Sequence, residues 1–251
     1  MRWGIVIIAG GTETGDLVTR MGTDHKGLAQ ISGSTSLART VAAVRESGLG
    51  PLRVVGPEEF RPLLQPDEWV AEADGAIQNV LVGLDALPED CEAVLTLPAD
   101  TPLMRGEHLV DFCRHLDGIA WAEPAWVATG LCPVDRFLSE YPGTPAVALR
   151  VRGVKVVTGG LFAGSPAGLR AGAGVAREFR ELRRHPFQML RRIGYGTLWR
   201  YLLGRITLDD ASKILGDLLG SRVFLWPHAH PATCMDFDNV AEFEAVLRFA
   251  R

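Results

Sequence analysis

The chain has 251 residues, of which 47% are hydrophobic and 22% are charged, and its formal net charge at pH 7 is −4. This composition excludes a disordered chain and a fibrous repeat, and the charge gives no global attraction to nucleic acid or to an anionic membrane. The four cysteines form no CxxC pair, so the sequence indicates neither a zinc site nor a thioredoxin-like motif. We expect them to be reduced and packed.

The apolar run at the N-terminus, in MRWGIVIIAGG, is too short for the core of a signal peptide. No stretch of the chain approaches the roughly 20 apolar residues that a membrane-spanning helix needs. We therefore expect a cytoplasmic protein without an integral membrane segment.

Strand and helix patterns alternate along the first half of the chain. The β-branched run Trp3–Ala9, closed by two glycines, is typical of a strand that is buried on both faces. Periodicity and glycine stops then predict five further segments: helix Ser36–Ser47, strand Leu52–Val55, helix Ile77–Leu87, strand Ala93–Leu97 and helix Leu109–Leu116.

This alternation predicts an α/β fold: three layers around a mostly parallel, Rossmann-like sheet, with ligands at the carboxyl ends of the strands. Beyond about residue 130 the pattern is less regular. Helical segments over 175–220 predict an insertion, followed by strand Val223–Trp226 and a last helix from Val240. We expect a single domain over residues 1–251 that carries this insertion.

The first candidate site is the turn Ala9-Gly10-Gly11. Two glycines after a buried strand let backbone N–H groups approach a phosphate chain, and the following loop brings Arg20 and Lys26 to the same rim of the sheet. The spacing matches neither GxGxxG nor GxxxxGKS, so the sequence indicates no dinucleotide fingerprint and no P-loop. The structural alternative is an ordinary turn.

The second and third candidate sites are acidic. Asp100, in LPADTPL, follows a central strand in a rigid turn, where a carboxylate can ligate Mg²⁺ or can instead cap the next helix. Asp236 and Asp238 precede the last helix, whose Asn239 and Glu242 resemble a capping box. Capping accounts for one of these two acids, so we favour metal binding by at least one of them.

The segments IIAGG, RMGTDHKGLAQISG, LPADTPL and DFDNVAEFE together resemble a known family. They are similar to nucleotidyltransferases with a glycosyltransferase-A-like fold, particularly the enzymes that attach guanylate or cytidylate to molybdopterin and their uncharacterised relatives. The resemblance covers roughly half of the chain. It implies a Mg²⁺-dependent enzyme that moves a nucleoside monophosphate from a nucleoside triphosphate to a small phosphate-bearing acceptor and releases pyrophosphate.

The resemblance also implies roles for individual residues. Nucleotide contacts would come from Ala9, Gly10, Gly11, Lys26 and Asn79, Mg²⁺ ligands from Asp100 with Asp238 or Asp236, and a second cation from Arg20. The loop between Gly11 and Arg20 is longer than in many relatives. Lys26 is therefore the stronger candidate for neutralising the α- and β-phosphates.

The predicted insertion is where the resemblance is poorest and where the acceptor site is expected. Residues 177–205 contain eight arginines against only two glutamates, a basic surface that suits a phosphorylated acceptor, a peripheral membrane contact or a solvated helix face. The glycine-rich stretch 158–174 suggests a mobile lid or hairpin turns.

The sequence leaves several alternatives open. The acceptor could be molybdopterin, a sugar phosphate or a phosphorylated lipid precursor. The same fold could instead serve a glycosyltransferase that uses a nucleotide-sugar, or a nucleotide-binding scaffold without catalysis. Nothing in the sequence indicates an oligomeric state.

Overall fold

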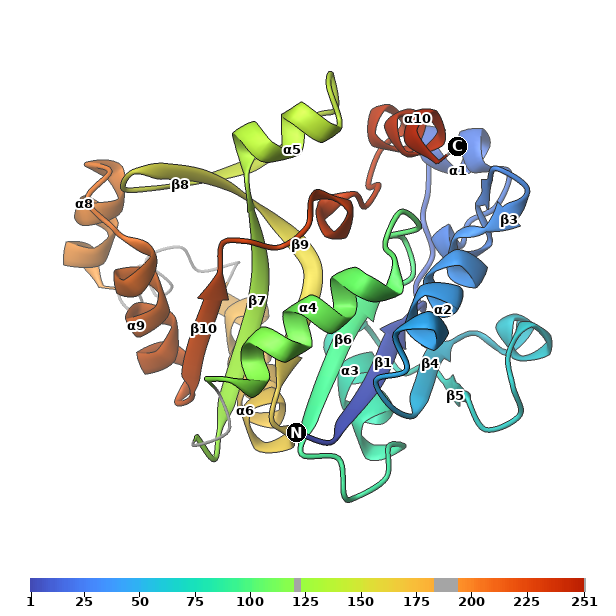
Figure 1. Cartoon of the computed structure of the whole chain (residues 1–251), viewed down its shortest axis with the longest axis horizontal. Helices are drawn as coiled ribbons and strands as arrows, with labels where there is room; N and C mark the ends of the chain where they lie inside the picture. Colours follow the sequence, from blue (N-terminus) through green and yellow to red (C-terminus); the bar gives the residue numbers. More distant parts are fainter. Residues whose placement is uncertain (120–122, 183–193, 251) are drawn as a thin grey trace.

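A computed structural model describes residues 1–119, 123–182 and 194–250 (Figure 1). The predicted basic surface 177–205 therefore lies partly outside the described residues, including the arginines at 183, 184, 191 and 192. In its described part, Trp199 and Leu202 are each 64% exposed.

The described residues form the following strands, with the four predicted ones among them. They are β1 (Trp3–Ile8), β2 (Gln30–Ile31), β3 (Ser34–Thr35), β4 (Leu52–Gly56), β5 (Trp69–Ala71), β6 (Ala93–Pro98), β7 (Trp126–Pro133), β8 (Ala148–Val151), β9 (Val154–Gly164) and β10 (Arg222–Trp226).

The helices lie between and after these strands. The α-helices are α1 (Asp16–Met21), α2 (Ser36–Ser47), α3 (Ala76–Asp85), α4 (Gly106–Asp117), α5 (Val134–Glu140), α6 (Pro166–Leu182), α8 (Tyr195–Leu202), α9 (Leu208–Leu219) and α10 (Val240–Phe249). Three short 3₁₀ helices are η1 (Lys26–Leu28), η2 (Glu58–Leu63) and η3 (Pro231–Cys234).

The main sheet runs in the order β10-β7-β9-β6-β1-β4-β5, and β8 pairs with the outer part of β9. Strands β6, β1, β4 and β5 are parallel, as are β10 and β7, whereas β9 lies antiparallel between β6 and β7. The parallel strands β1 and β6 end side by side, with Ile8 opposite Pro98. The predicted mostly parallel α/β sheet is confirmed.

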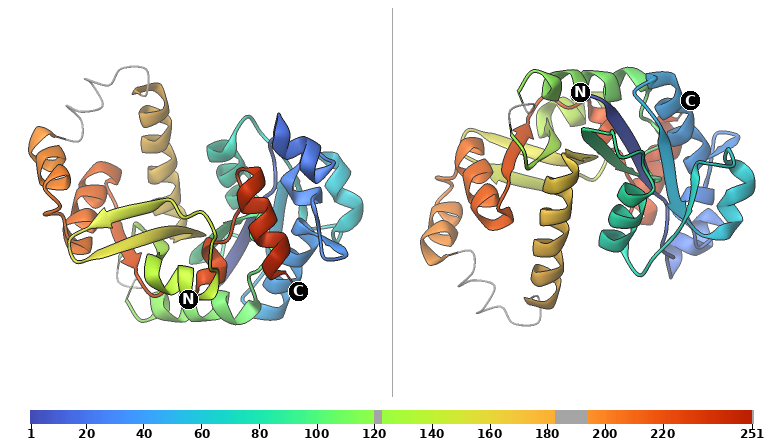
Figure 2. Two further views of the ribbon diagram at one scale, coloured as in Figure 1. Left: turned by 90° about the horizontal axis from the view of Figure 1, so that it is seen from above. Right: turned by 90° about the horizontal axis from the view of Figure 1, so that it is seen from below.

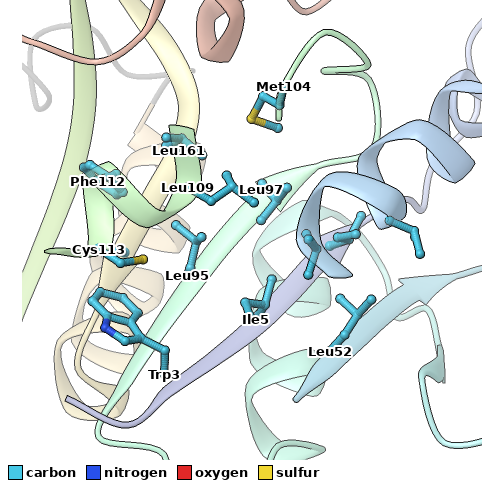
Figure 3. Close-up of a cluster of buried hydrophobic side chains, with 14 of the residues drawn as sticks. Trp3, Ile5, Leu52, Leu95, Leu97, Met104, Leu109, Phe112, Cys113 and Leu161 are labelled. Atoms are coloured by element: carbon cyan, nitrogen blue, oxygen red, sulfur yellow. The ribbon is translucent and has the colours of Figure 1, made fainter. Parts of the chain in front are cut away.

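Helices cover both faces of this sheet, which gives three layers (Figure 2). On one face α2 and α4 pack against β1, β4 and β6 through a core that includes Ile5, Leu95, Leu109 and Phe112 (Figure 3). On the other face lie α3 and α6 (Figure 1). A separate apolar cluster joins α1, α5, η3 and α10 above the carboxyl ends of the strands, which fixes the C-terminal segment over the rim.

Local sequence signals explain where α2 begins and ends. Thr35 caps its first turn by accepting a hydrogen bond from the backbone N–H of Ala38, and Gly48 ends it in the left-handed conformation that glycine favours. The last helix begins where it was predicted, and the side chain of Asn239 accepts a hydrogen bond from the N–H of Glu242. The predicted capping box is only half formed, because the carboxylate of Glu242 accepts a hydrogen bond from the N–H of Asp238 instead of Asn239.

The glycine-rich stretch 158–174 corrects a prediction. It is neither a lid nor a hairpin turn, since it forms the second half of β9 and the first half of α6. The glycines allow close packing instead: a Cβ on Gly160 would lie 2.9 Å from Cδ of Pro98, and one on Gly168 would lie 2.1 Å from the carbonyl oxygen of Trp126.

The other expectations concern the insertion, the cysteines and the membrane. Within 175–220 the described residues are helical over the end of α6, α8 and α9, and the view of the chain as one domain with an acceptor-shaping insertion stays a prediction.

All four cysteines are buried and free, as expected. None of the helices in the described ranges is long and apolar enough to cross a bilayer.

Candidate nucleotide and metal site

Lys26 joins acidic residues from distant parts of the chain. Its Nζ lies 3.0 Å from Oδ2 of Asp100, forms an ion pair with Asp238 and lies 3.5 Å from Oε1 of Glu13. The side chain of Lys26 is only 16% exposed. Asp100 and Asp238 therefore meet at one cationic group, as their predicted convergence requires.

The turn that carries Asp100 is held by hydroxyl groups of α2. Its neighbour Ala99 accepts a hydrogen bond of 2.7 Å from Oγ of Ser36, and its N–H donates to the carbonyl of Ile8. Arg39, also on α2, donates to the carbonyl of Pro102 at 3.0 Å. These contacts fix both flanks of Asp100, so the carboxylate is positioned before any ligand arrives.

The carboxylates and the ammonium group shift one another's pKa values. Burial alone would lower the pKa of Lys26, but the carboxylates of Asp100 and Asp238 outweigh burial and raise it. Burial raises the pKa of Asp100, while the ammonium group of Lys26 acts in the opposite direction. Burial, together with the charges of Asp100 and Asp238, raises the pKa of Asp236 to about 7. Asp236 therefore lies within the electrostatic influence of both Asp100 and Asp238.

The acidic group fits a divalent cation. Oδ1 of Asp100 is buried and has no hydrogen-bond partner, which leaves a ligand atom free at a crowded set of carboxylates. Among the described residues, no three His, Cys, Asp or Glu side chains are grouped into a complete metal site. Mg²⁺ does not require such a group, because it commonly binds one or two carboxylates together with waters and substrate phosphates.

The glycine turn is packed against α3. A Cβ on Gly10 would lie 2.2 Å from Oε2 of Glu72 and 2.6 Å from Nδ2 of Asn79, so any larger residue there would displace the ends of both side chains. Asn79 is 2% exposed, and its Oδ1 accepts a hydrogen bond of 2.7 Å from the N–H of Ala73. In this arrangement Asn79 positions the segment behind the turn, and its predicted nucleotide contact stays a prediction.

Two residues that the sequence did not single out hold Gly11. Its N–H donates to Oε2 of Glu72 at 3.0 Å, and its carbonyl lies 2.9 Å from Nδ1 of His25. Glu72 directly follows β5, so the rule for carboxyl ends of parallel strands places it at this rim. The three-residue strand is too short for its periodicity to be recognised in the sequence.

Arg20 is not part of the cluster around Lys26. It forms an ion pair with Glu244 and its guanidinium lies 5.6 Å from the centre of the Phe243 ring, so it fastens α1 to α10. Its predicted contact with phosphates would require this ion pair to open.

Comparison with known proteins adds a family match. The family model of the MobA-like NTP transferase domain matches residues 5–134, which include the glycine turn, Lys26 and Asp100. No curated protein matches the chain.

Several solved structures share the fold. A hypothetical transferase from Thermus thermophilus superimposes with a TM-score of 0.80 and 23% identity, covering 98% of this chain and 100% of that one. A nucleotidyl transferase from Methanothermobacter gives a TM-score of 0.58 and 17% identity, with coverage of 99% and 97%. A CMP:2-keto-3-deoxy-manno-octonic acid synthetase in complex with CTP gives 0.57 and 13%, with coverage of 99% and 98%.

Proposed function

The chain belongs to the MobA-like NTP transferase family, and from that premise we propose that it moves a nucleoside monophosphate from a nucleoside triphosphate to a phosphate-bearing acceptor with the help of Mg²⁺. The observation that carries this proposal is the position of Lys26, whose Nζ contacts both Asp100 and Asp238 beside the glycine turn. A cation and two carboxylates at one point suit a triphosphate that is bound together with a metal ion.

The proposed reaction needs no covalent intermediate on the protein. An oxygen of the acceptor phosphate forms a bond to the α-phosphorus of the triphosphate. The bond from the α-phosphorus to the oxygen that bridges to the β-phosphorus breaks, and its electron pair leaves with pyrophosphate. A phosphate monoester is largely ionised at neutral pH, so no general base is required. Catalysis then rests on positioning and on neutralising charge.

Different residues of this chain would neutralise charge and position the triphosphate. Lys26 would neutralise the α- and β-phosphates, because its raised pKa keeps the ammonium group charged throughout the physiological range. The backbone of the Gly10-Gly11 turn would lie against the base and the phosphates. Asp100 and Asp238, with Asp236 beside them, would hold Mg²⁺, which when bound neutralises phosphate charge and orients the triphosphate.

Two measurements test this proposal. Thermal unfolding with each of the common nucleoside triphosphates, with and without Mg²⁺, should show stabilisation by at least one triphosphate that is larger when Mg²⁺ is present. Pyrophosphate release should then require Mg²⁺ and a phosphorylated acceptor. Stabilisation by nucleotide-sugars alone would instead indicate a glycosyltransferase, and the absence of any shift would contradict nucleotide binding.

A further inference from the structure

A small pocket opens beside the paired acids Asp236 and Asp238. We call it the Thr144 pocket, and its volume is about 240 Å³. Its walls come from the loop before β8, from β9 and from the segment before α10. Its neutral lining includes Thr144, Pro145, Val147, Val157, Thr158 and Met235.

The pocket adjoins the reacting centre of the proposed function. Asp238 lines it and also forms the ion pair with Lys26, and Asp236 lines it as well. A ligand in the pocket would therefore lie next to the metal ligands and the triphosphate, where a second substrate has to lie. None of the neutral lining residues belongs to the cluster around Lys26.

The charges of the lining restrict that ligand. Its carboxylates are those of Asp236, Asp238 and Glu242, and no Lys, Arg or His among the described residues lines it. Asp236 and Asp238 would share the charge of a bound cation, whereas Glu242 accepts a hydrogen bond of 2.7 Å from the N–H of Asp238. An additional anionic group on the ligand would be repelled, and an uncharged or cationic group would not.

The size of the pocket is equally restrictive. A volume of 240 Å³ lies below the roughly 300–1,000 Å³ of pockets that enclose drug-sized molecules. The pocket would not enclose molybdopterin as a whole, whereas it would enclose a short aliphatic alcohol, amine or polyol. Val147, at the rim, is 80% exposed without a ligand and offers an apolar surface for such a group to cover.

One wall of the pocket contains an unpaired polar group. Thr144 is 7% exposed, and its Oγ1 is buried without a hydrogen-bond partner. A buried hydroxyl without a partner costs folding free energy, and a polar atom of a bound ligand would offset that cost. Rotation about χ1 of Thr144 moves its hydroxyl to another staggered position, from which we expect it to reach a ligand in the pocket.

We propose that the Thr144 pocket binds the body of the acceptor, and that this body is a small aliphatic group, uncharged or amine-bearing, with a polar atom that hydrogen-bonds Thr144. This inference rests on the proposed function and narrows it. Of the acceptor classes that the sequence left open, it favours a phosphorylated short alcohol over molybdopterin.

Three phosphate monoesters of similar size form the first test: glycerol 3-phosphate, phosphoethanolamine and 3-phosphoglycerate. Their bodies are neutral, cationic and anionic, respectively. Thermal shifts and pyrophosphate release are measured for each ester in the presence of Mg²⁺ and the triphosphate that stabilises the enzyme most. The neutral or the cationic ester should bind at millimolar concentration and the anionic ester should not. Equal or better binding of 3-phosphoglycerate, or binding of none of the three, would overturn the inference.

Two variants sharpen the test. Thr144→Val should raise the KM for the bound ester by roughly two- to tenfold, the range for one lost hydrogen bond, while Thr144→Ser keeps the hydroxyl and the KM. Val147→Lys changes an exposed position and should shift the preference toward 3-phosphoglycerate, because it supplies the missing cation. An unchanged KM in Thr144→Val, or an unchanged preference in Val147→Lys, contradicts the proposed pocket.

The two levels of proposal fail differently. If no triphosphate stabilises the chain, the proposed function is wrong. If a triphosphate binds but the ester preferences or the variants differ from these expectations, the proposed function stands and the assignment of the Thr144 pocket is wrong.

Thr40→Val is the control for Thr144→Val. Thr40 is a buried threonine whose Oγ1 donates a hydrogen bond to the carbonyl of Ser36, so this substitution removes an existing hydrogen bond and should lower the melting temperature.

Discussion

Asp100 combines three properties in one side chain: it is fixed by its neighbours, it is almost fully buried, and one of its oxygens has no partner. Asp100→Asn keeps the shape of this side chain and removes its charge. We expect the variant to fold and to lose Mg²⁺-dependent pyrophosphate release by about 10²-fold or more, since an amide is a poor ligand for a hard cation. Circular dichroism and a pyrophosphate assay measure the two effects separately.

Asp85→Asn is the matched control, because Asp85 is exposed and pairs with Arg170 far from the site. It should leave turnover unchanged. If Asp100→Asn were as active as this control, Asp100 would be only a turn former.

Gly10 is a second position where the addition of one methyl group should change stability and nucleotide binding. Gly10→Ala places a methyl group against Glu72 and Asn79, at distances that no real Cβ contact allows. We expect the segment that carries Glu72 to move, the free energy of unfolding to fall by about 1–3 kcal/mol, and the affinity for the triphosphate to fall with it. Urea unfolding and nucleotide titration measure both.

The helix α6 offers the control for this substitution. A Cβ on Gly172 would meet nothing within 4 Å, so Gly172→Ala should stabilise the chain by about 0.5–1 kcal/mol through helix propensity. Equal effects of the two substitutions would show that the close packing at Gly10 is unimportant.

At the residue scale, the sequence predicted the charged groups better than their partners. Lys26, Asp100 and Asp238 follow from rules about strand ends and helix starts. Glu72 and the free hydroxyl of Thr144 do not, because the first follows a very short strand and the second depends on which side chains surround it after folding. Burial and hydrogen-bond partners are properties of packing, which periodicity does not specify.

At the scale of elements, a pair of stacked imidazole rings joins α4 to η3. The rings of His108 and His230 lie 3.7 Å apart at an interplanar angle of 10°. Nδ1 of His108 accepts a hydrogen bond from the N–H of Arg105, and Nδ1 of His230 accepts one from the N–H of Ala232. Nδ1 of each ring therefore carries no proton, and both rings are neutral. The stack holds η3 in place, and η3 leads to Asp236 and Asp238.

This stack makes stability depend on pH. Burial, together with the repulsion that a charged ring would meet from a charged His230 and from Arg105, lowers the pKa of His108 from 6.5 to about 4. The unfolded chain then binds more protons than the folded chain between these two values, so stability falls as pH decreases through that window. We expect the free energy of unfolding to decrease by about 2 kcal/mol from this residue alone between pH 7 and pH 5.

Urea unfolding at the two pH values measures this decrease. His108→Gln cannot titrate and should show a decrease smaller by about that amount, although it is less stable at pH 7. An identical pH dependence in the variant and the original chain would assign the effect to other groups.

Elements were predicted well where their periodicity was long and poorly where glycines dominated. The helix Ser36–Ser47 has the bounds that its sequence predicts, because its cap and its glycine stop act locally. The stretch 158–174 was misinterpreted because glycine signals both flexibility and close packing. Only the neighbours of Gly160 and Gly168 show that packing applies here.

At the scale of the whole molecule, the site exists only because three distant segments meet. Lys26 lies 74 residues from Asp100 and 212 residues from Asp238 in the sequence, and no single element contains two of the three. The parallel strands β1 and β6 bring the first two segments to one rim, and the apolar cluster around α10 brings the third. The strand order made the first meeting predictable, whereas the second depends on tertiary packing alone.

Lys26 is the cation that joins the two acidic segments, those of Asp100 and Asp238, and this gives a prediction for the metal. Lys26→Met leaves the carboxylates of Asp100, Asp236 and Asp238 without a counter-charge. We expect a loss of about 2 kcal/mol in the free energy of unfolding without Mg²⁺, less than for a fully buried pair because Asp238 is 73% exposed. Mg²⁺ should then raise the melting temperature of this variant more than that of the original chain, with no nucleotide present.

Lys155→Met provides the control, since Lys155 is an exposed lysine on β9. Mg²⁺ should act on it as on the original chain, and potassium chloride at equal ionic strength should reproduce only the general screening of charge. If Mg²⁺ and potassium chloride stabilised Lys26→Met equally, the acids would not form a divalent cation site. A stabilisation that is specific to Mg²⁺ would show that the metal can replace Lys26 as the counter-charge of the carboxylates. A metal-bound triphosphate at this rim requires carboxylates that can bind the cation in this way.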